Sequence, residues 1–388
     1  MDENQMGKPP RELYDQREQS YVKHLFLTRY LQAGAFKIFQ GKSSVFNYVD
    51  AFAGPWRVQD DDALSDSSFF QVLNILDEVR NVLKKRGHTE ITLRIRLCEQ
   101  NSSRVKLLRE FAARRSQYDI QIFEGRFEDN LEAIAASCSG GFTFTFIDPT
   151  GWNLESSNIF SYLRKVDGEF LFNFMSDEIN RHAGWDGVAA SFGRFLACPK
   201  ERWREQFSAA DPCLSNEEKI LHILKQRMRE EKVAEFLPHM TIQHPRKDRV
   251  RMRLILGTHS PVAVNLFRDT QKRVLEEQIK LRHKIATKES GQPHLFSSTE
   301  LAQWEMQNIG AKNNITRETA KRKLLTLLTE MPGIRYKRLA PKILEDIDLT
   351  RPELNKLVMQ WRDEGLITFK IPPRKRVPQD DTIINLAC

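Results

Sequence analysis

The first segment that could carry out chemistry is residues 48–56, YVDAFAGPW, where an apolar run ends in an acid and a turn of small residues. Small residues let backbone N–H groups approach a ligand closely. Asp50 can orient this turn or hold a bound ammonium, because the carboxyl ends of strands are where open α/β sheets bind ligands. The alternative is a tight strand-to-helix connection with no ligand.

A second acid, Glu99, ends the run RIRLCE at residues 94–99. An acid at the end of a second strand is the usual partner of a ribose diol. The interval after Asp50 exceeds the usual spacing of about 20 residues, so the acidic loop 57–66 and a long helix must absorb the difference. Glu99 could instead cap the helix that follows it.

A third acid lies in residues 144–152, FTFIDPTGW, where a strand runs into a proline-stiffened turn. Asp148 could accept a hydrogen bond from a substrate amino group or take its proton, and Trp152 could stack on a flat base. With Pro149 between them, these residues form the predicted catalytic set. The alternative is that Asp148 only caps the next helix.

These three acids must be positioned by a sheet. Short segments rich in β-branched and aromatic residues alternate with helix-like stretches, which predicts a mainly parallel α/β sheet. Arg94 and Arg96 alternate with apolar neighbours, unlike a strand buried on both faces. Two further short strands, 240–244 and 249–256, flank a turn and predict an antiparallel hairpin. The predicted strands are residues 45–49, 91–97, 118–123, 142–147 and 169–174.

These motifs together resemble the class I S-adenosylmethionine-dependent methyltransferases and, within that fold, the three-Cys-motif partner proteins. The resemblance covers residues 21–285 and predicts a Rossmann-like sheet closed by the hairpin. It rests on the turn from Asp50 to Trp56, the serine-rich helix start at Ser65–Ser68, Glu99, the FIDPTG turn at 146–151 and the segment LILGTHSP at 254–261.

The resemblance also implies a cofactor, a partner and roles for single residues. S-adenosylmethionine would have its methionine end beside Asp50, Phe52, Ala53 and Gly54, its ribose on Glu99 and its methyl group facing Asp148. The family name implies a partner protein with three cysteines of the kind that bind an iron–sulfur cluster.

Two residues depart from the family pattern. Trp56 stands where the family usually has glycine, which puts a bulky ring at the turn. Arg126 stands where an acid often contacts the adenine amino group, and Glu128 could replace that acid. Thr150 and Gly151 also depart from the Asp-Pro-Pro-aromatic turn of enzymes that methylate base amino groups, so methylation of a base is one possibility that the turn leaves open.

The last 80 or so residues resemble a winged helix-turn-helix domain, with helices predicted at 315–330, 336–344 and 351–364, a strand at 366–371 and a basic tip at 372–376. In that fold the third helix enters the major groove and the wing contacts phosphates. Residues 311–388 hold 16 Lys and Arg against 10 Asp and Glu. The alternative is a domain that contacts only protein. The predicted nucleic-acid contacts are Arg351, Lys356, Arg374, Lys375 and Arg376.

The whole chain has 388 residues and a formal net charge of +8, which fits two domains and weakly favours a polyanion partner. Five cysteines without a CxxC pair predict reduced thiols and no metal site. No apolar run is long enough for a membrane span, and the polar start lacks a signal peptide's apolar core, so we predict a cytoplasmic protein.

The predicted organisation is a flexible segment at 1–20, a methyltransferase-like domain at 21–287 with a helical insertion at 176–239, a linker at 288–305 and a winged helix at 306–388. Two functions remain open. The chain is either a methyltransferase acting on a nucleic-acid base in DNA or RNA, or an inactive scaffold that pairs with the three-cysteine partner and anchors it on nucleic acid.

Overall fold

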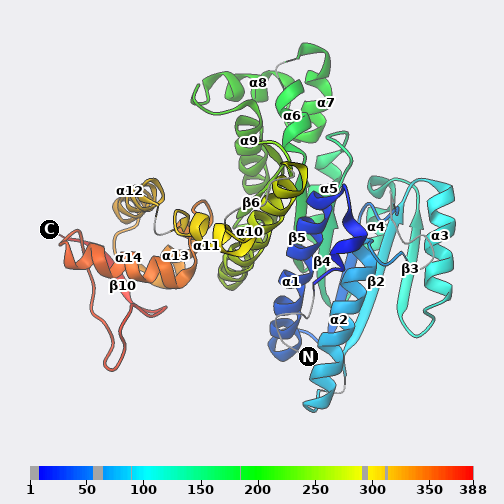
Figure 1. The fold of residues 1–388 in the computed structure, drawn as a ribbon, viewed down its shortest axis with the longest axis horizontal. Helices are drawn as coiled ribbons and strands as arrows, with labels where there is room; N and C mark the ends of the chain where they lie inside the picture. Colours follow the sequence, from blue (N-terminus) through cyan, green and yellow to red (C-terminus); the bar gives the residue numbers. More distant parts are fainter. Residues whose placement is uncertain are drawn as a thin grey trace. The chain divides into compact units, whose positions relative to one another are not determined.

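A computed structural model describes residues 8–55, 64–88, 90–183, 185–290, 296–310 and 313–387 (Figure 1). Its internal contacts divide the chain into two compact units. We call residues up to 235 with residues 240–257 the sheet unit, and residues 236–239 with 258–388 the C-terminal unit. Among the described residues, no helix is both long and apolar enough to cross a membrane.

The sheet unit is built on a seven-stranded sheet of order β3-β2-β1-β4-β5-β7-β6. Within the five strands β1 to β5, every pair of neighbouring strands is parallel. Strand β7 runs antiparallel to β5. This confirms the predicted α/β, Rossmann-like sheet of the class I methyltransferase type, closed by a hairpin. The strands are β1 (Val45–Asp50), β2 (Thr92–Glu99), β3 (Asp119–Glu124), β4 (Phe142–Ile147), β5 (Gly168–Phe174), β6 (His239–Gln243) and β7 (Val250–Gly257).

The two arginines of β2 have structural partners that explain their place in a buried strand. Arg96 is almost fully buried, and its guanidinium donates to both carboxylate oxygens of Asp119 on β3, each at 3.0 Å. Arg94 donates to the backbone oxygen of Ser139. The edge strand β3 therefore compensates the burial of the Arg96 guanidinium, whereas Arg94 is only half-buried.

The helices of the sheet unit include those of the predicted insertion at 176–239, whose aromatic side chains pack together. Phe192 is 5.8 Å from Trp203 between ring centroids and 6.4 Å from Phe195. These elements are η1 (Arg11–Tyr14), α1 (Glu18–Gly41), α2 (Ser68–Lys85), α3 (Ser102–Ala113), α4 (Phe127–Ser137), α5 (Ser156–Lys165), α6 (Ser176–His182), η2 (Asp186–Val188), α7 (Ala189–Phe195), α8 (Lys200–Ala209) and α9 (Asn216–Glu230).

The described part of the N-terminal segment differs from the flexible one predicted for residues 1–20. Tyr14 is buried and its ring lies edge-on to Tyr21. Its hydroxyl is 2.8 Å from Nδ1 of His24 and donates to the backbone oxygen of Asp66. A buried tyrosine with a satisfied hydroxyl ties this segment to α1 and to the start of α2. Residues 1–7 lie outside the described residues.

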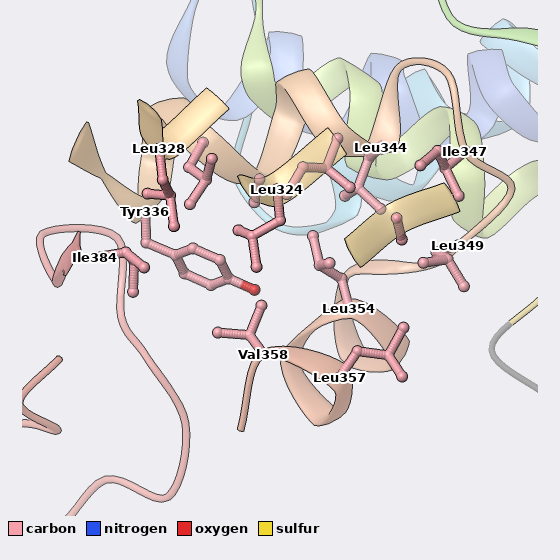
Figure 2. Close-up of a cluster of buried hydrophobic side chains, with 14 of the residues drawn as sticks. Leu324, Leu328, Tyr336, Leu344, Ile347, Leu349, Leu354, Leu357, Val358 and Ile384 are labelled. Carbon is pink, nitrogen blue, oxygen red and sulfur yellow. The ribbon is translucent and has the colours of Figure 1, made fainter. Parts of the chain in front are cut away.

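The C-terminal unit contains helices and a small sheet of order β8-β10-β9. Its core joins Leu324 and Leu328 of α12, Tyr336 of α13, Val358 of α14 and Ile384 of β10 (Figure 2). The elements are α10 (Pro261–Ser290), α11 (Ser298–Met306), α12 (Asn314–Glu330), β8 (Ile334–Arg335), α13 (Tyr336–Leu344), α14 (Arg351–Asp363), β9 (Ile367–Thr368) and β10 (Ile383–Leu386).

The long helix α10 belongs to the C-terminal unit, although the predicted linker at 288–305 follows it in the sequence. Arg268 of α10 is fully buried and donates to the backbone oxygens of Leu344 and Glu345, where α13 ends, and to Asp348. A buried guanidinium must satisfy its donors, so these bonds hold α10 against α13. Of the predicted linker, residues 291–295 lie outside the described residues, and α11 occupies 298–306.

Candidate functional site

A cleft of about 710 Å³ lies in the sheet unit, beside the turns that follow β1, β2, β3 and β4. The carboxyl ends of parallel strands meet at one edge of a sheet, which is why turns far apart in the sequence meet here. The sequence-predicted residues that line the cleft are Phe52, Ala53, Gly54, Glu99, Glu128, Asp148, Pro149 and Trp152. Asp50 does not line it.

Asp50 is fully buried beneath the turn that follows β1. Its carboxylate accepts hydrogen bonds from the Ser68 hydroxyl at 2.6 Å, the Tyr48 hydroxyl at 3.1 Å and the Phe52 backbone N–H at 3.2 Å. Burial, with a smaller contribution from the nearby Asp148, raises the pKa of Asp50 to about 6, although the hydrogen bonds from Ser68, Phe52 and Tyr48 lower it. These contacts orient the turn and the start of α2, the first of the two roles that the sequence left open for this acid.

Gly54 allows the β1 turn to approach the Glu99 carboxylate. A Cβ atom at residue 54 would lie only 1.9 Å from Glu99 Oε2 and 2.8 Å from Cδ of Arg104. The requirement is therefore for space. Glu99 is buried at the end of β2, where its Oε1 accepts the Asn101 backbone N–H at 2.7 Å. Trp56, the predicted departure in this turn, lies outside the described residues.

The second predicted departure, Arg126, is paired with the acid that could replace the missing one. Its guanidinium donates to Glu128 Oε1 at 3.2 Å, and the same oxygen accepts the backbone N–H of Glu155. The Glu128 side chain is 5% exposed, whereas that of Arg126 is 45% exposed. Both residues line the cleft, with the carboxylate already engaged.

Asp148 follows β4 and is held from two sides. Asn173, on β5, donates its Nδ2 to Asp148 Oδ1 at 2.5 Å. Lys23, on α1, forms an ion pair with Asp148 Oδ2. Lys23 and Asn173 both line the cleft, and neither was predicted from the sequence. The sequence held one signal for Lys23, because Lys23 and His24 stand between the apolar residues Val22 and Leu25. The structure shows that both side chains are buried.

Trp152 has contacts with the helical insertion. Its ring stacks on Phe192 of α7, with centroids 5.1 Å apart and ring planes 9° from parallel. Its indole N–H donates to the Ser191 hydroxyl at 3.1 Å, and the His182 ring lies 5.1 Å away. The ring face used by Phe192 is therefore occupied by the protein. Trp152 thereby fixes α7 beside the β4 turn.

Further charged groups at the cleft wall were not predicted from the sequence. Arg251 of β7 lines the cleft and donates to Asp177 Oδ2 at 2.6 Å, while Arg249 donates to Oδ1 of the same carboxylate. Burial holds the pKa of His24 well below its usual value, so this imidazole is neutral at neutral pH. Among the described residues, no cluster of acids, histidines and cysteines could hold a metal ion.

The predicted nucleic-acid residues of the C-terminal unit fall into two groups. Arg351, at the start of α14, pairs with Asp380 at 3.0 Å and lies 4.1 Å over the Tyr336 ring, so it is engaged within the unit. Lys356 on α14 is exposed. Exposed on the loop between β9 and β10 are Arg374, Lys375 and Arg376.

Comparison with known proteins gives a likeness in structure only. Neither the known family models nor the curated proteins match this chain. Human methyltransferase-like protein 13 in complex with SAH has 11% identity, with 69% of this chain and 93% of that one covered, at a TM-score of 0.28. A loganic acid methyltransferase with SAH has 9% identity, with 76% and 89% covered, also at 0.28. Because these scores are low, the fold assignment rests on the strand order.

Proposed function

We propose that the sheet unit binds S-adenosylmethionine and transfers its methyl group to a base of a nucleic acid. The observation that carries this proposal is the convergence of three separate turns on one cleft. These turns contribute Gly54, Glu99 and Asp148, which are the positions expected from the family resemblance.

The residues present fit the cofactor. The cleft volume lies in the range of small-molecule sites, about 300–1,000 Å³. Gly54 lines the cleft, and because it has no Cβ the β1 turn can lie directly against the Glu99 carboxylate. Glu99 can accept hydrogen bonds from ribose hydroxyls. When bound, the cofactor supplies an electrophilic methyl group on a sulfonium.

Asp148 would orient the methyl acceptor. Its carboxylate can accept an N–H of a base amino group, because each oxygen has a second lone pair beyond those that Asn173 and Lys23 use. In such a transfer the acceptor nitrogen would form a bond to the methyl carbon while the carbon–sulfur bond of the cofactor breaks. Asp148 or water then takes the proton that this nitrogen releases. Pro149, buried in the same turn, stiffens the backbone behind the carboxylate.

We also propose that the C-terminal unit is a winged helix that brings nucleic acid to the enzyme. Support comes from three helices, α12 to α14, packed on a three-stranded antiparallel sheet. The proposal assigns α14 with Lys356 to the major groove. It assigns the loop with Arg374, Lys375 and Arg376 to the phosphates.

A cytoplasmic location of the protein stays a prediction.

The scaffold function is the second candidate. It is favoured by the pairing of Arg126 with Glu128, which engages the carboxylate that would otherwise meet an adenine amino group. In this function the sheet unit would hold the three-cysteine partner, and the cleft would be a relic without turnover.

Isothermal titration of the full chain with S-adenosylmethionine decides between the two functions. Micromolar binding that Glu99→Gln weakens at least about tenfold, a loss typical of one charged hydrogen bond, would support the enzyme. Glu124→Gln is the matched control, because Glu124 ends the neighbouring strand β3, pairs with Arg109 at 2.8 Å and does not line the cleft. Absence of binding by the unaltered chain would favour the scaffold.

A further inference from the structure

The Lys23–Asp148 ion pair occupies an unusual place for a lysine. The Lys23 side chain is only 10% exposed, yet it lines the cleft and its ammonium meets the Asp148 carboxylate. Removing an ammonium from water is costly unless a partner compensates for it. A fixed positive charge therefore stands beside the group proposed to hold the methyl acceptor.

An exposed lysine just after the same helix provides a comparison. Lys42, which caps the C-terminal end of α1, pairs with Asp167 at 3.0 Å, just before β5 begins. Those side chains are 47% and 75% exposed, and neither lines the cleft. Exposed pairs of this kind contribute little to stability. The Lys23 pair differs from it in burial and in position.

Other titratable groups lie at the cleft or directly beneath it. Asp50 lies buried close enough to Asp148 for their charges to interact, and burial raises its pKa. Arg251 is paired with Asp177. Glu178 also lines this part of the cleft. Within the part of the chain that the structure describes, Lys23 is the cation paired with Asp148, and its positive charge offsets that of the carboxylate.

We propose that Lys23 is a positioning residue that fixes the Asp148 carboxylate and neutralises its charge. The carboxylate then does not add an electrostatic attraction for the sulfonium of S-adenosylmethionine at the reacting end of the cleft. This inference rests on the proposed function. Its consequence is a limit on ground-state binding: an uncompensated carboxylate would bind the charged substrate more tightly without lowering the barrier to methyl transfer.

The test uses two ligands that differ by one charge. S-adenosylmethionine carries a sulfonium, whereas S-adenosylhomocysteine has a neutral thioether. Lys23→Met should raise the ratio of their affinities in favour of S-adenosylmethionine by about threefold or more, as expected for one nearby charge in a partly solvated site. Asp148→Asn should lower the ratio by a similar factor. The double variant should return it close to the original value.

The titrations are made with the full chain at pH 8 and low salt. Lys23→Arg should keep the original ratio, because the positive charge remains. Lys42→Met, at the C-terminal cap of the same helix, should leave both affinities unchanged. Far-ultraviolet circular dichroism and a thermal melt confirm that each variant is folded.

The possible outcomes separate the two proposals. If the unaltered chain binds neither ligand, the proposed function fails and the role of Lys23 fails with it. If it binds both and Lys23→Met leaves the ratio unchanged, only the role of Lys23 is overturned. A fall of both affinities by the same factor would likewise assign Lys23 to structure alone.

Discussion

The two units hold their charges in opposite ways. At the cleft of the sheet unit, Asp50 and Glu99 are buried, and Asp148 is paired with a buried lysine. On the loop between β9 and β10 of the C-terminal unit, Arg374, Lys375 and Arg376 are exposed. Buried charges act through fixed geometry and are weakly screened, whereas exposed charges act through counterions. Each unit therefore responds to a different kind of perturbation.

The largest expected effect concerns the cost of burying Asp50, and it appears in stability. Burial raises the pKa of this acid from an ordinary 3.8 to about 6, so between these values the folded chain binds a proton that the unfolded chain does not. The unfolding free energy of the original chain, relative to Asp50→Asn, should therefore fall by roughly 2 kcal/mol as pH rises from 4 to 7.

Urea denaturation of both proteins at several pH values measures this difference. Above about pH 7 the carboxyl is ionised in both states, so the difference should level off. The opposite result would be a rise, with increasing pH, in the unfolding free energy of the original chain relative to Asp50→Asn. It would mean that the hydrogen bonds from Ser68, Tyr48 and Phe52 outweigh burial and hold the pKa of Asp50 low.

A smaller effect is expected where the β1 turn meets Glu99. Gly54→Ala puts a Cβ atom 1.9 Å from Glu99 Oε2, so the carboxylate must move. We expect overpacking to cost about 1–3 kcal/mol of stability and the affinity for S-adenosylmethionine to fall. Gly151→Ala is the control, because its Cβ would have ordinary contact with Glu178 at 3.7 Å. Equal binding by both variants would disprove the role given to Gly54.

The smallest effect on stability, and the clearest effect of salt, is expected at the loop between β9 and β10. Replacing Arg374, Lys375 and Arg376 with glutamine should leave the thermal midpoint unchanged. The salt dependence of binding to duplex DNA should become shallower by about 2–3 in the log–log slope, one contact for each charge removed. Fluorescence anisotropy at several salt concentrations measures it.

Arg351→Gln provides the opposite pattern in the same unit. Arg351 is paired with Asp380 and packed over Tyr336, so its replacement should lower the thermal midpoint and leave the salt slope nearly unchanged. A salt slope unaffected by the triple variant would instead indicate that the C-terminal unit contacts protein.

Much of the fold follows from local patterns in the sequence. The alternation of short apolar strands with helical stretches predicted the parallel sheet, and the turn at 245–248 predicted the closing hairpin. Parallel strands bring their carboxyl ends to one edge, so acids that end such strands meet without any further information. This reasoning brought Glu99 and Asp148 to one cleft.

Other features depended on packing between distant parts of the chain. The partner of Asp148 is Lys23, the stacking partner of Trp152 is Phe192, and the contacts of Arg268 with Leu344 attach α10 to the C-terminal unit. Periodicity shows which face of an element is apolar, but it does not show which other element covers that face.

The sequence by itself therefore determined the kind of sheet, the edge at which its acids gather and the basic character of the last 80 or so residues. The tertiary structure alone decided that Asp50 is buried below the cleft and that Asp148 is held by a lysine. The physical reason is that burial and charge pairing depend on how elements pack, and only the folded chain brings residues 23 and 148 together.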